Sequence, residues 1–310
     1  LEEVLAREMT ATISGLVHVR FDAEEGDKAR LVLAGTVLAR EVADRYSASV
    51  ALTDRNSGLV IAQSVARFRE AGLDRTPTEF YRDSPSLVRD RSVEAYVKTS
   101  TTPAGQLADP LYVQQLPTAA VLAAALEAYN KGEWETALAL YSAAGSRPDG
   151  HQLRTLNGIY LGNIRLGRLA AAEEAFGRIA AYGLETNNLA VKLLFRPGTT
   201  EFWPGQELGR MYPMWLRQIA RAAHAAKRCV NVVGHTSRTG PEAFNDTLSL
   251  NRAESVKRIM EAEVPGLARQ LRATGVGFRE NIIGSGADDA SDAVDRRVEF
   301  RVVSCAAGSS

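Results

Sequence analysis

One stretch in the last third of the chain combines an apolar run, a polar loop and a helical pattern. The apolar run ends at Val233, the loop covers residues 234–240, and Pro241 is suited to the first turn of a helix. In that predicted helix, Leu248 and Arg252 are four residues apart and therefore share a face. The stretch predicts a buried strand, a polar loop and a helix whose Arg252 points back toward the loop.

Further fragments of one motif surround this stretch. In chain order they are Gly234-His235-Thr236, Gly240, Asn245, Leu248-Ser249, Arg252-Ala253 and Asp295-Arg296-Arg297-Val298-Glu299. Together they resemble the OmpA-like peptidoglycan-binding domain of bacterial envelope proteins, whose motif is Gly-His-Thr-Asp, a Gly, an Asn, Leu-Ser-x-x-Arg-Ala and a final Asn-Arg-Arg-Val-Glu. The resemblance extends over roughly residues 189–305 and implies an α/β sandwich, in which helices and strands alternate over one sheet.

The resemblance also implies a ligand, the diaminopimelate-containing stem peptide of peptidoglycan. The residues that it assigns to binding are Thr236, Ser237, Asn245, Leu248, Arg252 and Arg296. Arg252 is expected to pair with a ligand carboxylate as a planar bidentate donor. Thr236 and Asn245 are expected to form hydrogen bonds with the ligand.

Two positions depart from the family motif. Ser237 replaces the Asp that, in the family, holds the ammonium group of diaminopimelate, and Asp295 replaces the Asn before the paired arginines. A serine hydroxyl brings no charge, and a charge-assisted hydrogen bond is roughly twice as strong as a neutral one. The loss is expected to cost about 1–3 kcal/mol of binding free energy. These departures concern the ligand and leave the predicted fold unchanged.

The apolar pattern predicts the remaining elements of this C-terminal region. A first strand is expected at 189–195, a first helix from Leu208 to Ile219 and a closing strand at 298–303. Pro265 is expected to break the second helix, which then restarts over 267–274.

Length and pattern predict a multidomain α+β protein rather than one ordinary domain. The expected parts are an N-terminal antiparallel sheet with a helix at 1–75, a connecting region at 76–117, central α-helical repeat pairs at 118–186, the OmpA-like α/β sandwich at 187–305 and a tail at 306–310.

The N-terminal part shows one helical pattern, at 1–16, and four strand patterns, at 16–21, 30–40, 46–54 and 59–68. In the third strand, Tyr46, Ala48, Val50 and Leu52 alternate with polar residues and are expected to face the core. The run from Leu33 through the turn at Ser57-Gly58 resembles the CsgG- and LpoB-type envelope lipoproteins, which implies a small periplasmic interaction domain. A plain α+β domain fits the same residues.

The central part contains an internal repeat. Gly132, Ala137 and Tyr141 correspond to Gly167, Ala172 and Phe176, 35 residues later. This spacing is close to that of tetratricopeptide repeats, and the segment 118–184 resembles two such helix-turn-helix units. Either a groove for a partner peptide or a structural spacer is consistent with the pattern.

The two cysteines, Cys229 and Cys305, lie at the start of one predicted strand and just after another. If these strands are adjacent and antiparallel, the thiols meet, and a disulfide suits an oxidising periplasm. The alternative is two separate small apolar residues.

Composition and motifs argue against several functional classes. With 37 basic and 37 acidic residues the net charge is zero, which gives no support to nucleic-acid binding. No apolar run approaches ~18 residues, so no transmembrane helix is predicted. The four histidines have no metal-ligand spacing, and Ser237 has no nucleophile-elbow motif around it. We therefore expect no cofactor, no metal and no enzymatic activity.

The sequence leads to two hypotheses for a modular, periplasm-facing envelope protein. In the first, the OmpA-like domain attaches to peptidoglycan while the other domains bind envelope proteins. In the second, the pocket is degenerate and the chain is a scaffold component of an envelope assembly. Because the chain begins with Leu1, a signal or lipidated segment that associates it with the outer membrane is expected upstream.

Overall fold

The computed structural model describes residues 29–39, 45–73, 77–196, 198–202, 210–282, 286 and 295–305. The predicted helix at 1–16, the predicted strand at 16–21 and the tail at 306–310 lie outside these residues. The chain divides into two compact units. The N-terminal unit holds residues 1–74, 91–128 and 139–150, and the C-terminal unit holds residues 75–90, 129–138 and 151–310. Within the described residues, no helix is long and apolar enough to cross a bilayer.

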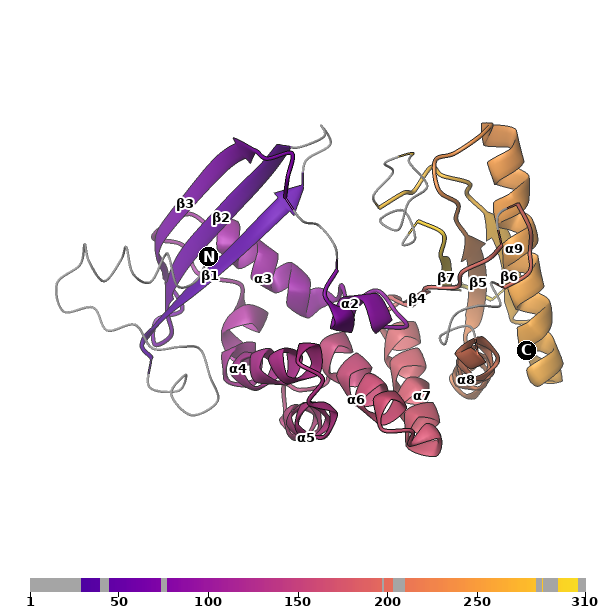
Figure 1. Cartoon of the computed structure of the whole chain (residues 1–310), viewed down its shortest axis with the longest axis horizontal. Helices are drawn as coiled ribbons and strands as arrows, with labels where there is room; N and C mark the ends of the chain where they lie inside the picture. Colours follow the sequence, from indigo (N-terminus) through magenta and orange to yellow (C-terminus); the bar gives the residue numbers. More distant parts are fainter. Residues whose placement is uncertain are drawn as a thin grey trace. The chain divides into compact units, whose positions relative to one another are not determined.

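The described part of the N-terminal unit contains a three-stranded antiparallel sheet in the order β1-β2-β3 (Figure 1). Its strands are β1 (Leu31–Ala39), β2 (Arg45–Asp54) and β3 (Val60–Arg69). The turn between β2 and β3 forms because the Asp54 carboxylate accepts the N–H groups of Asn56 and Ser57, and because Gly58 adopts a positive φ of 70°. The predicted antiparallel sheet is confirmed.

Helix α3 (Arg91–Thr101) covers one face of this sheet (Figure 1). The core beneath it contains Val32, Ala34, Ala51 and Val60 from the sheet, together with Ala95, Ala108, Tyr112 and Leu116. The prediction that Val50 and Leu52 face the core is wrong, because Ala51 is buried and these two residues are only half-buried. Small side chains on the covered face allow close helix packing, and Thr36 and Ser100 share a hydrogen bond of 2.8 Å between their hydroxyl groups.

The connecting region and the centre of the chain are helical. Helices α2 (Glu79–Asp83), α4 (Pro110–Asn130), α5 (Trp134–Gly145), α6 (Leu153–Arg165) and α7 (Leu169–Glu185) follow in order. The glycines of the internal repeat occupy equivalent turns, since Gly132 has a φ of 79° and Gly167 a φ of 69°. Their partners Ala137, Tyr141, Ala172 and Phe176 are all fully buried.

The described part of the C-terminal unit contains a four-stranded sheet in the order β4-β7-β5-β6. Its strands are β4 (Ala190–Val191), β5 (Cys229–Gly234), β6 (Leu271–Gly275) and β7 (Val298–Val303). Strands β5 and β6 are parallel, and β7 is antiparallel to both β4 and β5. Helix α9 (Glu242–Glu263) packs against β5 and β6, and α8 (Tyr212–Ala225) packs against α9 (Figure 1). The predicted α/β sandwich is confirmed.

Strand β6 differs from the sequence prediction, which placed a helix over 267–274. The chain instead forms a short 3₁₀ turn at Pro265–Leu267 and then pairs with β5, where Leu271 lies opposite Val230. The segment is too short for its apolar pattern to distinguish helix from strand, and the hydrogen-bonding edge of β5 decides the outcome.

Strands β5 and β7 bring the two cysteines together. Cys229 lies opposite Val303 in the antiparallel pair, and Val303 is two residues before Cys305. A disulfide joins Cys229 and Cys305, whose Cα atoms are 5.2 Å apart. The bridge closes a loop that contains the whole candidate motif.

Helices α6 and α7 share one core with helix α8. The buried Trp215 of α8 donates its indole N–H to the Tyr160 hydroxyl at 2.8 Å and stacks on Phe176 with 5.4 Å between ring centroids. On the rim of this contact, the guanidinium of Arg217 donates to Glu173 at 2.8 Å. The helix pair and the C-terminal sandwich are therefore packed as one body.

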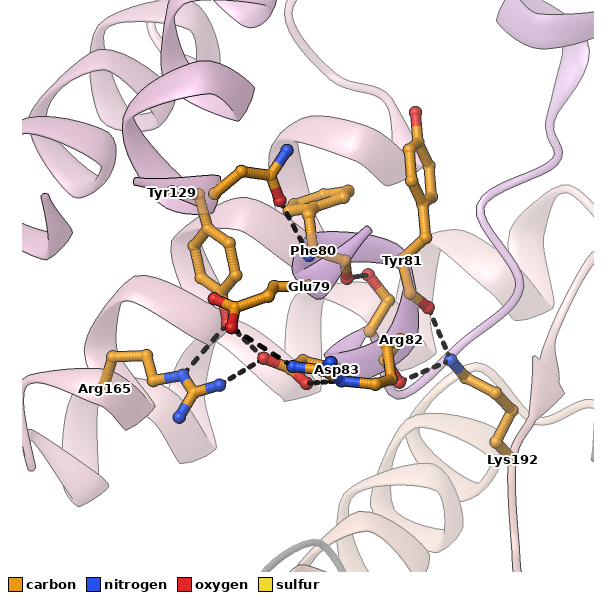
Figure 2. A network of polar contacts seen from close by, with 10 residues as sticks. Glu79, Phe80, Tyr81, Arg82, Asp83, Tyr129, Arg165 and Lys192 are labelled. Carbon is orange, nitrogen blue, oxygen red and sulfur yellow. Dashed lines mark hydrogen bonds and ion pairs between the residues drawn. The ribbon is translucent and has the colours of Figure 1, made fainter. Parts of the chain in front are cut away.

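A polar network fixes the short helix α2 in the same unit (Figure 2). The Asp83 carboxylate accepts the Tyr129 hydroxyl at 2.9 Å and pairs with Arg165. The Lys192 ammonium donates to the carbonyl groups of Tyr81, at 2.8 Å, and Arg82, at 3.1 Å. Since Lys192 directly follows β4, these bonds join α2 to the edge of the C-terminal sheet.

Candidate binding site

The loop after β5 and the loop after β6 meet at the N-terminal half of α9. A Cβ on Gly234 would overlap the carbonyl group of Ser249, and one on Gly275 would overlap the backbone of Leu250. Both positions therefore need glycine for the backbones to approach. This requirement explains why Gly234 bounds the loop that the sequence singled out.

Ser249 joins the two loops to the helix. Its hydroxyl accepts the N–H of Gly277 at 2.9 Å and donates to the carbonyl of Asp246, also at 2.9 Å. The carbonyl of Gly277 in turn accepts the N–H of Thr236 at 2.9 Å. Ser249 is a positioning residue that sequence reasoning did not assign to the site, although it belongs to the Leu-Ser motif.

Asn245 shapes the first loop. Its buried side-chain amide donates to the carbonyl of Thr239 at 2.8 Å and to the carbonyl of Pro241 at 3.1 Å. Gly240, between these two residues, has a positive φ of 82°. The amide of Asn245 therefore holds the loop that carries Thr236 and Ser237.

Thr236 and Ser237 are both buried, at 2% and 6% of their full exposure. The Ser237 hydroxyl lies 3.2 Å from the Thr239 hydroxyl, within hydrogen-bonding distance. The Thr236 hydroxyl has no hydrogen-bond partner among the described residues. A buried hydroxyl without a partner costs about 1–3 kcal/mol, so a ligand acceptor or donor at Thr236 would recover part of that energy.

Arg252 lies two turns after Asn245 on the buried face of α9 and is 3% exposed. Its Nε donates to the carbonyl of Thr199 at 3.0 Å and its Nη2 to the carbonyl of Arg196 at 3.2 Å. Its guanidinium also lies 4.8 Å from the centre of the Phe195 ring. The positive charge is thus placed under the segment that follows β4.

The predicted site residues have different surroundings. Asn245 contacts the loop that bears Thr236 and Ser237, whereas the contacts of Arg252 include Phe195, Arg196 and Thr199. Leu248, between them on α9, and Arg296, just before β7, are half-buried. The assignment of all six to ligand binding stays a prediction.

A second polar cluster, at His235 and β7, was missed by sequence reasoning. Glu299 and Arg301 share one face of β7, and Arg297, just before the strand begins, continues their alternation. Arg297 donates to Glu299 at 2.7 Å, and Arg301 donates to the same carboxylate at 2.9 Å. Burial alone would raise the pKa of Glu299, but His235 and the two arginines outweigh it and hold this pKa well below its ordinary value. The alternation of Glu299 and Arg301 with apolar residues is visible in the sequence, but it predicts only a strand and not the ion pairs that these residues form.

Comparisons with known proteins agree on this region. Residues 195–294 match the OmpA family. A 74-residue segment is 42% identical to outer membrane porin F of Pseudomonas fluorescens, covering 24% of this chain and 22% of the porin. The chain thus spans about a fifth of the length of that curated relative.

Solved structures give matches of similar extent. The peptidoglycan-associated lipoprotein from Burkholderia pseudomallei is 25% identical, with 36% of this chain and 88% of that chain covered and a TM-score of 0.31. The cell wall anchor of the T6SS from Pseudomonas aeruginosa is 24% identical, with 37% and 80% covered and a TM-score of 0.30. From the sequence match and the α/β architecture, residues 195–294 are an OmpA family domain.

Proposed function

We propose that this chain is a non-enzymatic protein of the bacterial cell envelope that attaches to peptidoglycan through its OmpA family domain. The observation that carries the proposal is the match over residues 195–294, which contains the loop at 234–240 and Arg252. The resemblance of these residues to the peptidoglycan-binding motif makes the diaminopimelate-containing stem peptide the ligand.

In this proposal, Arg252 pairs with a carboxylate of the stem peptide. Its donors now bond to the carbonyls of Arg196 and Thr199, and a carboxylate replaces them favourably because a bond between two charged groups is roughly twice as strong. The hydroxyl of Thr236 bonds to the ligand, and Ser237 takes a weakened form of the role of the family's Asp. Asn245 fixes the conformation of the loop at 234–240, while Leu248 and Arg296 complete the surface that binds the stem peptide.

The other parts of the chain then bind envelope partners. We place the protein in the periplasm, associated with the outer membrane through an upstream lipidated or signal segment. The N-terminal sheet serves as an interaction domain of the CsgG and LpoB type, and the helices of the internal repeat serve as tetratricopeptide-like units. The exposed apolar side chains of the sheet, among them Val37, Ile61 and Val65, support a role in protein contacts.

A second candidate function is a scaffold in an envelope assembly with a degenerate pocket. Two observations favour it: Ser237 brings no anion for the diaminopimelate ammonium, and the donors of Arg252 are already engaged by backbone carbonyls. In that case the domain keeps the fold of the family without its ligand.

Sedimentation with purified sacculi separates the two functions. Wild type should bind, Ser237→Asp should bind about five- to tenfold more tightly because charge assistance adds ~1 kcal/mol or more, and Arg252→Ala should hardly bind. Arg258→Ala, an exposed arginine of the same helix, is the matched control and should bind like wild type. Binding by Ser237→Asp but not by wild type would favour the scaffold function. If neither wild type nor Ser237→Asp binds, peptidoglycan is not the ligand of this domain.

A further inference from the structure

His235 is a buried polar side chain whose hydrogen-bonding capacity is unused. Its side chain has 0% exposure, and neither ring nitrogen has a hydrogen-bond partner among the described residues. The nearest carboxylate oxygen, Oε1 of Glu299, lies 3.6 Å from Nε2, which is too long for a hydrogen bond. Leaving such a group unsatisfied costs about 1–3 kcal/mol, so a partner for the imidazole would stabilise the fold.

Two carboxylates, those of Glu280 and Glu299, lie close to the imidazole of His235. Glu299 projects from β7 with 18% exposure, and Glu280, in the segment after β6, has 44% exposure. One coordinating atom from each of His235, Glu280 and Glu299 can be chosen so that all three lie within 4.8 Å of one another. A buried imidazole and two carboxylates are a donor set suited to divalent transition metals.

A cation already bridges these carboxylates. Nη2 of Arg301 contacts Oε2 of Glu299 at 2.6 Å and also pairs with Oε2 of Glu280. The carboxylates are therefore ionised and oriented toward one positive charge. The Arg301 side chain is 37% exposed, so its guanidinium can turn into solvent when another cation replaces it.

We propose that His235, Glu280 and Glu299 form a site for a divalent transition metal ion of the Zn²⁺ class, which displaces the guanidinium of Arg301. With metal–ligand bonds of about 2.0–2.2 Å, a tetrahedral site needs its ligand atoms roughly 3.3 Å apart. The shift from the present spacing falls mainly on Glu280, because that side chain is the most exposed of the three. Water supplies the fourth ligand.

Charge balance sets the strength of the site. Two carboxylates neutralise a divalent ion, but Arg297 is 4% exposed and stays bonded to Glu299, so its positive charge weakens metal binding. The guanidinium of Arg301 competes with the metal for the same two carboxylates, so removal of its charge should strengthen metal binding. Alkaline-earth ions prefer all-oxygen sites, and the imidazole ligand selects against them.

The test is calorimetric titration of the full chain, free of any affinity tag, with zinc chloride and separately with calcium chloride. Zinc should bind wild type at one site while calcium does not bind. Glu280→Gln should weaken zinc binding at least fivefold, His235→Ala at least tenfold, and Arg301→Gln should strengthen it at least threefold. The exposed His224→Ala is the matched control and should leave the affinity unchanged.

Equal zinc affinity in wild type, Glu280→Gln and His235→Ala would overturn the proposal, because binding would then occur elsewhere on the chain. Absence of zinc binding by both wild type and Arg301→Gln would also overturn it. Glu280 is exposed, so its substitution keeps the test decisive if the buried His235 variant does not fold.

Discussion

Replacing Trp215 by Ala tests whether the helix pair α6–α7 and the OmpA family domain are one folding unit. The substitution removes a fully buried ring that stacks on Phe176, and it leaves the buried Tyr160 hydroxyl without its indole donor. Loss of a buried Trp costs about 3–5 kcal/mol, and the orphaned hydroxyl adds about 1–3 kcal/mol. Together these amount to roughly 4–8 kcal/mol of unfolding free energy.

Differential scanning calorimetry and hydrogen exchange measure the effect. For a unit of roughly 150–250 residues, each kcal/mol lowers Tm by about 2–4 °C, so Trp215→Ala should lower it by about 10–30 °C. Peptides from α7 and from α9 should lose protection together. Tyr160→Phe, which removes only the hydroxyl, should lower Tm by about 2–12 °C, from a cost of about 1–3 kcal/mol. Phe244→Ala, at an exposed aromatic residue of α9, is the control and should change little.

Loss of protection in α8 and α9 alone, with α6 and α7 unchanged, would refute the shared core. A shift in Tm below about 2 °C for Trp215→Ala would refute it as well.

Three further predictions concern stability. Ala137→Leu should overpack a fully buried position and cost about 1–3 kcal/mol in urea unfolding, and an unchanged midpoint would contradict close packing there. Burial lowers the pKa of Lys192 from 10.5 to about 8, so the unfolded chain binds more protons than the folded chain between these two pH values. Relative to Lys192→Met, the unfolding free energy of wild type should therefore rise by up to about 3 kcal/mol as pH increases from about 8 to 10.5. A difference between the two proteins that does not change with pH would contradict this prediction. The pKa of Glu299 is lowered well below its ordinary 4.5, so the stability that this carboxylate contributes is complete above about pH 4.5 and is lost progressively as pH falls below that value. The difference in unfolding free energy between wild type and Glu299→Gln should therefore shrink steadily as pH falls from about 4.5, and a difference that stays constant would contradict this prediction.

The elements with strong local signals could be predicted from the sequence. Strands β1, β2 and β3 lie within one or two residues of their expected ranges, because alternating patterns and the turn at Gly58 bound them. The loop at Gly234 and the helix that follows it are also where the motif placed them. In each case, the local pattern and the tertiary contacts favour the same structure.

The predictions failed where tertiary contacts decide between similar local patterns. Alternation in β2 shows that the strand has two faces, but the side on which α3 packs depends on residues of α3, which begins only at Arg91. Strand β6 depends likewise on its partner β5. Periodicity cannot supply either contact.

The candidate site shows the same limit. The motif identified Arg252 and Thr236 but gave no sign that Arg252 would donate to the carbonyls of Arg196 and Thr199. Nor did it show that His235, next to Thr236, would be buried beside Glu299 without a hydrogen-bond partner. Such contacts join segments more than 50 residues apart, so only the folded chain reveals them.

Titration of the isotopically labelled chain with a diaminopimelate-containing stem peptide, followed by NMR, is a direct test of peptidoglycan binding by the OmpA family domain. We expect saturable shifts of the Thr236 and Ser237 amide signals and of the Arg252 Nε signal, because Arg252 exchanges its backbone carbonyl partners for the ligand carboxylate. A stem peptide with lysine in place of diaminopimelate, which lacks that carboxylate, should leave the Arg252 Nε signal in place. Absence of shifts at these three positions at millimolar peptide, or identical shifts with both peptides, would contradict peptidoglycan binding by this domain.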